Sequence, residues 1–181
     1  MKNDYKILFI GRTGVGKTTA INTVSQSKVI ATDVAMTSGG SAQKITTTVG
    51  LDYGEFTAKH LSENYLMRLY GVPGQDRFSY SWEILQKGCS GIILLADATH
   101  KFLLEDIIYY NEMMSRNEYS VPMIIAIMKH DELEIPQLNK LKQTIQAQKS
   151  KSPILWIDAR DADTVVTVLY KLLRMITGSG V

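Results

Sequence analysis

The sequence predicts a three-layer α/β fold, with a mostly parallel six-stranded sheet, one antiparallel strand and helices on both faces. Short apolar runs recur along the chain, and amphipathic stretches separate them. The later runs are almost continuously apolar, which is typical of parallel strands buried on both faces. We therefore expect six strands, at residues 6–10, 51–57, 65–70, 91–96, 123–128 and 154–157.

The stretches between these strands show helical spacing. A helix is expected directly after the first strand, over residues 19–24, and polar residues 60–64 predict an antiparallel hairpin between the second and third strands. Two further helices each place their apolar residues on one face, at Leu103, Ile107, Tyr110 and Met114 and at Val165, Val168, Leu169, Leu172 and Ile176. Residues 31–44 are rich in Ser, Thr, Gly and Ala, so we expect a long mobile loop there.

Composition and charge exclude several classes of protein. The 181 residues carry a formal net charge of +2 with no basic run, which gives nucleic-acid binding no electrostatic support. A single cysteine, Cys89, excludes an internal disulfide and suits a reducing compartment, and we expect it to be a small buried residue. The longest apolar run, residues 121–128, is too short to cross a bilayer. We therefore expect a cytoplasmic protein without its own membrane anchor, which reaches a membrane only through a partner.

The segment from Gly11 to Thr18, GRTGVGKT, fits the pattern G-x-x-x-x-G-K-[ST]. It lies between an expected strand and an expected helix, which is the context that a phosphate-binding P-loop requires. Glycines let the backbone turn tightly, so that its N–H groups point toward phosphate oxygens near the positive end of the helix. Lys17 would then reach the outer phosphates, and the hydroxyl of Thr18 would bind a magnesium ion.

Two later segments resemble the Ras-like GTPases. Residues 46–53, TTTVGLDY, resemble the effector loop entering the second strand, and Thr48 occupies the position of the family's threonine that closes over magnesium and the γ-phosphate. Residues 71–78, GVPGQDRF, resemble the family's second switch, in which Gly74 meets the γ-phosphate and Gln75 orients the attacking water.

The second switch lacks its leading aspartate, which steadies the magnesium shell through water in this family. Gly71 stands in that position. Magnesium would then be held by Thr18, Thr48 and phosphate oxygens. Asp52 is a candidate replacement, but its expected place inside a strand argues against it.

A third segment, which ends in Met128-Lys129-His130-Asp131, resembles the family's guanine-recognition motif N/T-K-x-D. Asp131 would accept two hydrogen bonds from guanine, the stem of Lys129 would pack across the base, and Met128 replaces the usual Asn or Thr. Residues 158–160, DAR, resemble the family's S-A-K loop, in which the N–H of Ala159 would meet guanine O6.

The resemblance runs from about residue 6 to residue 176 and implies a single small-GTPase domain over residues 1–181, with the P-loop small-GTPase fold. The chain looks like a prokaryotic branch of the family, similar to the gliding-motility polarity GTPase and to small GTPases that accompany roadblock-domain proteins. This resemblance implies GTP or GDP and Mg²⁺ as ligands, and a roadblock-type activating partner or effector. The implied nucleotide-binding residues are Gly11, Arg12, Thr13, Gly14, Val15, Gly16, Lys17, Thr18, Thr19, Thr48, Gly74, Lys129, Asp131, Asp158, Ala159 and Arg160.

The function expected from these motifs is that of a GTP-binding switch, with Gln75 and Lys17 catalytic and Thr18 and Thr48 on the metal. Its unaided turnover is expected on the order of 10⁻³ s⁻¹ or below. Arg12, Arg68 and Arg77 lie near the expected site, and none is favoured as a catalytic arginine. Two alternatives stay open: a catalytically impaired pseudo-GTPase that acts as a protein scaffold, and a P-loop ATPase or kinase, against which Asp131 argues.

Overall fold

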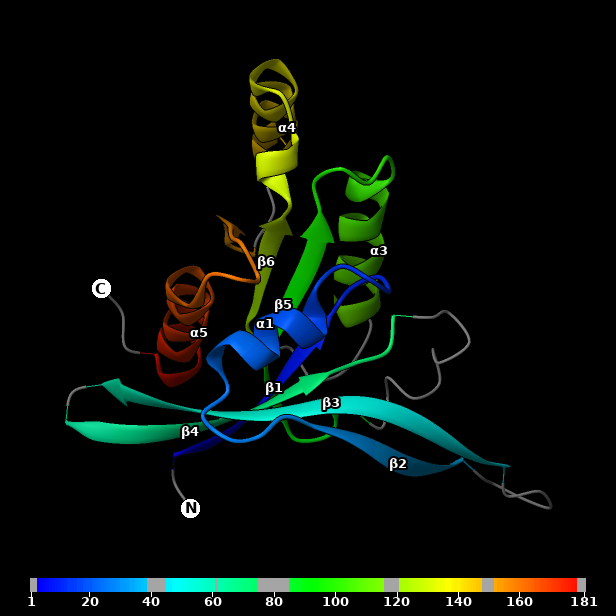
Figure 1. Cartoon of the computed structure of the whole chain (residues 1–181), viewed down its shortest axis with the longest axis vertical. Coiled ribbons are helices and arrows are strands. Elements are labelled where there is room, and N and C mark those ends of the chain that lie inside the picture. Colours follow the sequence, from blue (N-terminus) through cyan, green and yellow to red (C-terminus); the bar gives the residue numbers. More distant parts are fainter. Residues whose placement is uncertain are drawn as a thin grey trace.

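A computed structural model describes residues 3–38, 45–60, 62–74, 85–115, 121–147 and 152–178, with only the backbone described at 31–38, 45–50, 113–115 and 146. Seven described strands form one sheet in the order β2-β3-β4-β1-β5-β6-β7 (Figure 1). Their bounds are β1 Asp4–Ile10, β2 Ile30–Ser38, β3 Ile45–His60, β4 Glu63–Gly71, β5 Cys89–Asp97, β6 Met123–Met128 and β7 Ile154–Trp156.

The strand directions confirm the predicted fold class. Strand β1 pairs in parallel with β4 and β5, and β6 pairs in parallel with β5 and β7. Strand β3 pairs antiparallel with both β2 and β4, so it is the one reversed strand among the seven described. The predicted hairpin between β3 and β4 is therefore present.

The expectation of a loop over residues 31–44 is wrong for its first eight residues, and the sheet has seven described strands instead of six. Residues Ile30–Ser38 form β2, which pairs with β3 from Ile30–Tyr53 to Ser38–Ile45. The composition suggested a loop, but the segment also contains the β-branched residues Ile30, Thr32, Val34 and Thr37, which suit a strand once a partner is available. Residues 39–44 lie outside the described part of the chain.

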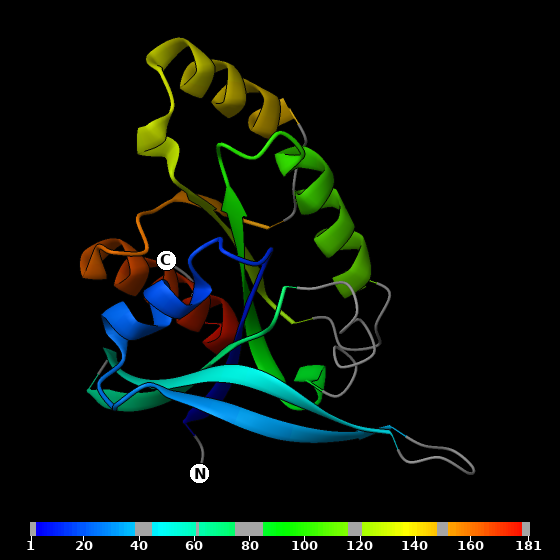
Figure 2. The same cartoon turned by 45° about the vertical axis from the view of Figure 1, so that its right-hand side comes forward.

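Helices cover both faces of the sheet, as predicted (Figure 2). Helices α1 (Lys17–Val24) and α5 (Ala162–Thr177) lie on one face. Helix α3 (Leu103–Ser115) lies on the other, where Ile145 of α4 (Ile135–Ala147) joins the same core. A 3₁₀ turn, η2 (His130–Glu132), follows β6.

Strand β1 divides its side chains between two separate cores. Ile7 and Phe9 pack with α1 and α5, whereas Leu8 and Ile10 pack with α3, and all four are fully buried. This alternation follows from the two-residue period of a strand. Because β1 is also the middle strand of the seven described, the glycine loop that follows it leaves the sheet at its centre.

The C-terminal helix α5 has the amphipathic pattern that its sequence predicts. The carboxylate of Asp161 caps its first turn by accepting a hydrogen bond from the N–H of Asp163. Gly178 ends the helix with a φ of 67°, in the left-handed region. Its buried residues are Val165, Val168, Leu169, Leu172 and Leu173.

Cys89 is partly buried at the start of β5, where its thiol donates a hydrogen bond to the carbonyl of Gly91. Burial raises the pKa of this thiol to about 11, so it stays protonated at neutral pH. A protonated, partly buried thiol is a poor nucleophile, and no catalytic role is assigned to it.

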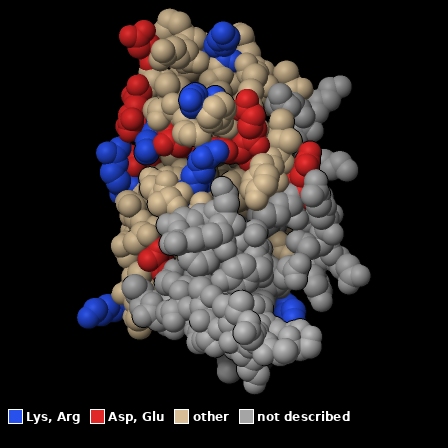
Figure 3. Space-filling model, turned by 90° about the vertical axis from the view of Figure 1, so that its right-hand side faces the viewer, with Lys and Arg blue, Asp and Glu red and all other residues tan. Residues whose placement is uncertain are grey.

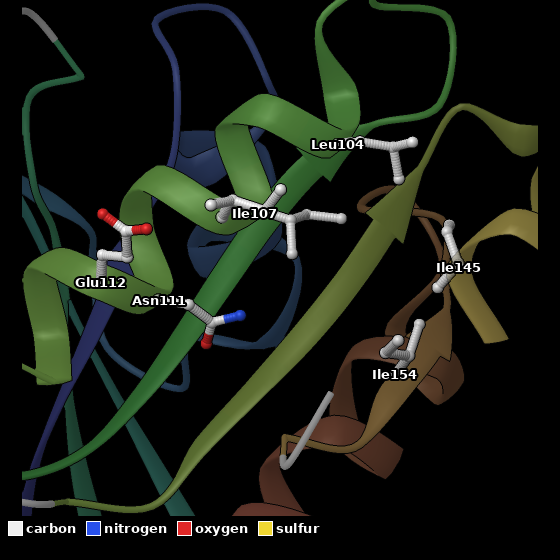
Figure 4. A pocket seen from close by; sticks show the side chains of 7 residues that line it. Leu104, Ile107, Asn111, Glu112, Ile145 and Ile154 are labelled. Carbon is white, nitrogen blue, oxygen red and sulfur yellow. The ribbon is translucent and has the colours of Figure 1, made fainter. Parts of the chain in front are cut away.

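A small apolar pocket of about 140 Å³ lies between α3, α4 and β7 (Figure 4). Figure 4 shows side chains of α3 facing Ile145 of α4 and Ile154 of β7. The described lining includes no Lys, Arg or His, so this pocket does not suit a phosphate. Its described lining residues are Leu104, Ile107, Ile108, Asn111, Glu112, Ile145 and Ile154.

Charged side chains of both signs are interspersed over the described part of the face shown in Figure 3. This mixture agrees with the small net charge of +2. Within the described residues, no helix combines the length and apolar character needed to cross a membrane.

We predict that Gly54→Ala destabilises the fold, because β3 approaches α1 closely at this glycine. A Cβ atom at Gly54 would lie 2.7 Å from Cγ2 of Ile21 and 2.8 Å from Oγ of Ser25. Overpacking of this kind costs about 1–3 kcal/mol of the free energy of unfolding. Urea denaturation measures the loss, and Lys59→Ala, which truncates an exposed side chain on the same strand, should leave the midpoint almost unchanged. Equal midpoints for Gly54→Ala and the native protein would contradict the prediction.

Candidate functional site

The loop between β1 and α1 has a backbone that needs its glycines. Gly11, Gly14 and Gly16 have φ angles of 134°, 79° and 108°, which residues with side chains rarely adopt. A Cβ atom at Gly11 would lie 2.2 Å from the carbonyl oxygen of Leu95 in β5. The loop thus turns tightly against the neighbouring strand and leads into the N-terminus of α1, where unpaired N–H groups favour an anion.

Lys17 lies in the first turn of α1 and reaches back over the loop. Its side chain is 8% exposed, and its Nζ donates hydrogen bonds to the carbonyl oxygens of Gly11 at 2.8 Å and Arg12 at 2.7 Å. Burial lowers the pKa of Lys17 to about 8, and the nearby charge of Asp52 raises it in part. A phosphate placed in the loop would meet this ammonium group directly.

The structure also brings Asp52 close to the glycine loop. Its place inside a strand had argued against a role in the site. Oγ1 of Thr18 donates a hydrogen bond to Oδ2 of Asp52 at 2.5 Å. Asp52 lies in β3 directly opposite Gly71 of β4. The expectation that a strand position keeps Asp52 away from the site is therefore wrong, because β3 and β4 bring this part of the strand beside α1.

The two switch-like segments are described only in part. Thr48 pairs with Ala35 in the β2–β3 ladder, and the position of its side chain is not among the described features. Gly74 lies against the glycine loop, since a Cβ atom there would be 2.3 Å from the carbonyl oxygen of Gly11 and 2.5 Å from the nitrogen of Thr13. Gln75 and Arg77 lie outside the described residues.

The base-recognition residues predicted from the sequence line one pocket together with the glycine loop. This pocket has a volume of about 210 Å³. It joins segments that are more than a hundred residues apart in the sequence. Its described lining residues are Gly14, Val15, Gly16, Thr19, Met128, Lys129, Asp131, Glu132, Asp158, Ala159 and Arg160.

Three charged side chains meet at the outer end of this pocket. The NH2 nitrogen of Arg160 lies 2.7 Å from Oδ2 of Asp158 and 3.3 Å from Oδ2 of Asp131. Hydrogen bonds from Arg160 lower the pKa of Asp158 to about 2, and the same pair raises the pKa of Arg160. Arg160 therefore offsets the repulsion between two carboxylates that face the same opening.

Lys129 is fixed by a residue to which the sequence analysis assigned no role. Its Nζ forms an ion pair with Oδ2 of Asp97 at 2.6 Å, across the carboxyl ends of β5 and β6. Burial raises the pKa of Asp97, but hydrogen bonds from Lys129 and Thr99 outweigh it and hold this pKa below its ordinary value. The sequence does contain one signal for this role of Asp97. An aspartate ends the apolar strand that comes before the strand leading to Lys129.

Met128 and Ala159 connect the base end of the pocket to the phosphate end. A Cβ atom at Gly16 would lie 3.4 Å from both Cε of Met128 and Cβ of Ala159. The hydroxyl of Thr23 in α1 donates a hydrogen bond to the carbonyl of Ala159 at 2.8 Å. Met128 is 3% exposed, so it acts here as a packing residue between the two halves of the pocket.

Two candidate catalytic arginines have acidic partners. Nε of Arg12 lies 2.6 Å from Oδ2 of Asp106 in α3, and the NH2 nitrogen of Arg68 lies 2.7 Å from Oδ2 of Asp4. The guanidinium of Arg12 is therefore held by α3, and that of Arg68 is held by β1.

A glycine loop with positive φ angles, a buried lysine and an adjoining pocket at the carboxyl ends of parallel strands define a P-loop nucleotide-binding protein. The chain matches the Ras family over residues 6–178. It therefore belongs to the Ras family of small GTPases, for which a GTP-binding switch is the general function and GTP hydrolysis the general reaction.

Individual relatives agree with this assignment at low identity. The chain is 22% identical to the Ras-related protein SEC4 of Candida albicans over 173 residues, which cover 94% of this chain and 76% of the relative. It is 23% identical to the ADP-ribosylation factor-like protein 3 of Saccharomyces cerevisiae, over 83% of this chain and 75% of the relative. It is 28% identical to the Ras-related protein Rab-8A of Gallus gallus, over 57% of this chain and 44% of the relative.

We predict that Arg160→Gln raises the pKa of Asp158 from about 2 toward the ordinary aspartate value of 3.8, because the hydrogen bonds that stabilise the carboxylate are lost. A folded-state pKa below the unfolded value favours the folded protein above pH 3.8, and this effect disappears as the pH falls through about 2. Carboxyl chemical shifts followed by NMR between pH 2 and 6 measure the change. Arg174→Gln, an exposed arginine of α5, is the matched control and should leave the Asp158 titration where it is.

Proposed function

We propose that this protein is a guanine-nucleotide switch that hydrolyses GTP slowly by itself and exchanges protein partners with the state of its nucleotide. The observation that carries the proposal is the single pocket in which the glycine loop and Thr19 adjoin Asp131 and Ala159. One ligand with phosphates at one end and a base at the other fits this arrangement.

At the phosphate end, backbone N–H groups of residues 11–18 and the ammonium group of Lys17 bind the phosphates. The hydroxyls of Thr18 and Thr48 would help to hold a magnesium ion, which would supply positive charge beside the phosphates. We assign the contact with the outermost phosphate to the N–H of Gly74, and the closeness of Gly74 to the glycine loop supports this role.

At the base end, Asp131 supplies the selectivity. Its carboxylate accepts hydrogen bonds from N1–H and the exocyclic amine of guanine, whereas adenine has neither donor on that edge. The N–H of Ala159 donates to guanine O6, and the stem of Lys129 packs over the base while Asp97 holds its ammonium group. Asp158 and Arg160 complete the rim of this pocket.

Hydrolysis requires a positioned water molecule and charge stabilisation. We assign the positioning of water to Gln75. Arg12 and Arg68 are held by Asp106 and Asp4, which supports a slow unaided rate, on the order of 10⁻³ s⁻¹ or below. An arginine from a partner protein then supplies the missing charge.

The partner that we propose is a roadblock-domain protein, acting as GTPase activator or effector. This step rests on the likeness of the T-T-x-x-D-Y, G-x-P-G-Q-D-R-F and D-A-R segments to a prokaryotic branch of the family. On the same basis we propose a single domain over residues 1–181, a cytoplasmic location and recruitment to membranes by a partner when it occurs.

Calorimetric titration of GTP, GDP and ATP in the presence of magnesium tests the proposed function. We expect both guanine nucleotides to bind and ATP to bind far more weakly, because only guanine satisfies Asp131. Preference for ATP would instead indicate a P-loop ATPase or kinase. Absence of binding to all three would indicate a pseudo-GTPase scaffold, for which the substitutions at Gly71 and Met128 are the specific argument.

We predict that Asp131→Ala weakens GDP binding by about 10- to 150-fold, which corresponds to the ~1.5–3 kcal/mol of a hydrogen bond to a charged group. Weak ATP binding should not fall further, because adenine makes no use of this carboxylate. The control is Glu134→Ala, which removes an exposed carboxylate outside the pocket lining. A uniform loss of GDP and ATP binding in Asp131→Ala would point to damage to the pocket and contradict a role in selectivity.

A further inference from the structure

The Asp52 side chain occupies the space beside Gly71, the position from which the second switch lacks its acid. The two residues face each other in the β3–β4 ladder. A Cβ atom at Gly71 would lie 3.0 Å from Oδ2 of Asp52 and 3.1 Å from its Cβ. A carboxylate from β3 thus reaches the place that a side chain at the end of β4 would enter.

This carboxylate is already bonded to the residue that the P-loop motif assigns to magnesium. Oγ1 of Thr18 donates its proton to Oδ2 of Asp52 at 2.5 Å. A hydroxyl that donates its proton in this way keeps its lone pairs available for a cation. The carboxylate that accepts the bond also fixes the orientation of the hydroxyl, as partners of metal ligands commonly do.

We propose that Asp52 supplies from β3 the carboxylate that steadies the magnesium ion of a bound guanine nucleotide, an inference that rests on the proposed function. Magnesium keeps several of its water molecules and takes one or two carboxylates together with substrate phosphates. Within the described chain, no group of three or more His, Cys, Asp or Glu side chains could hold a metal by itself. One carboxylate, one hydroxyl and the phosphates of a nucleotide therefore suit this position.

The same geometry explains why residue 71 is a glycine. Asp52 and the Cδ1 atom of Ile21 both lie within 3.1 Å of where its Cβ would be. An aspartate at 71 would collide with Asp52 and place a second negative charge beside it. Asp52 and Gly71 therefore form a pair across the ladder. The side chain of Asp52 leaves room only for a glycine at position 71.

Magnesium-dependent release of a fluorescent GDP analogue tests this assignment. In Asp52→Asn, which is nearly isosteric, we expect the magnesium concentration needed for slow release to rise about 10- to 100-fold. With EDTA present, release from Asp52→Asn should be as slow as, or slower than, release from the native protein. Without a cation, the native carboxylate only repels the phosphates.

The exchange variant D52G/G71D returns the acid to β4 and removes the collision, because its Asp52 side chain is absent. It should regain most of the magnesium sensitivity that Asp52→Asn loses. Glu55→Gln removes another carboxylate from β3 and is the control, with native behaviour expected. Circular dichroism confirms that each variant is folded.

The outcomes separate the two proposals. Native magnesium dependence in Asp52→Asn overturns the role of Asp52, while GDP binding by the native protein leaves the proposed function standing. Failure of the native protein to bind GDP at any magnesium concentration overturns the proposed function instead. Equal weakening of Asp52→Asn with magnesium and with EDTA assigns Asp52 a structural role and overturns the inference, whether or not the exchange variant folds.

Discussion

The complete burial of residues 7–10 of strand β1 between two cores is the constraint on which the site depends. Ile7, Leu8, Phe9 and Ile10 alternate between the α1–α5 core and the α3 core, and none of them is exposed. A strand held on both faces and paired on both edges has no freedom to shift along its axis. The glycine loop that leaves its carboxyl end is therefore fixed relative to every neighbouring strand.

The parallel arrangement around β1 then brings the functional groups to one edge of the sheet. Strand β5 ends at Asp97, β6 ends just before Lys129, and the segment after β7 carries Ala159. Because parallel strands end at the same edge, residues that are far apart in the sequence meet there without any long connection. Met128 and Ala159 lie beside Gly16, so this edge is continuous from the phosphate end to the base end.

Much of the fold could be predicted from the sequence because its strongest signals are local. The run Met123–Met128 forms a strand with the predicted bounds, and the glycine loop follows β1 as its motif requires. Strand β2 was missed because its stability comes from pairing with β3, and its polar, small-residue composition resembles that of a loop. For the same reason β3 begins at Ile45, several residues before the predicted strand.

The site could be predicted only where one segment carries the chemistry. Lys129, Asp131 and residues 158–160 lie in recognisable segments, and the structure gathers them in one pocket. The residues that hold the site together come from other segments. Asp97 forms an ion pair with Lys129, Thr23 donates a hydrogen bond to Ala159, and Asp52 accepts one from Thr18. Each of these contacts depends on how separate elements lie side by side, which local patterns do not specify.

The pairing of Asp52 with Gly71 divides two tasks between two strands. The carboxylate lies on β3, while Gly74, after β4, fits closely against the glycine loop. With the acid on β3, the side chains at positions 71 and 74 have only to be small, since Gly71 lies against Asp52 and Gly74 lies against the glycine loop. The sequence of the turn after β4 could therefore change in such a protein, while a carboxylate in β3 still stabilised the bound cation.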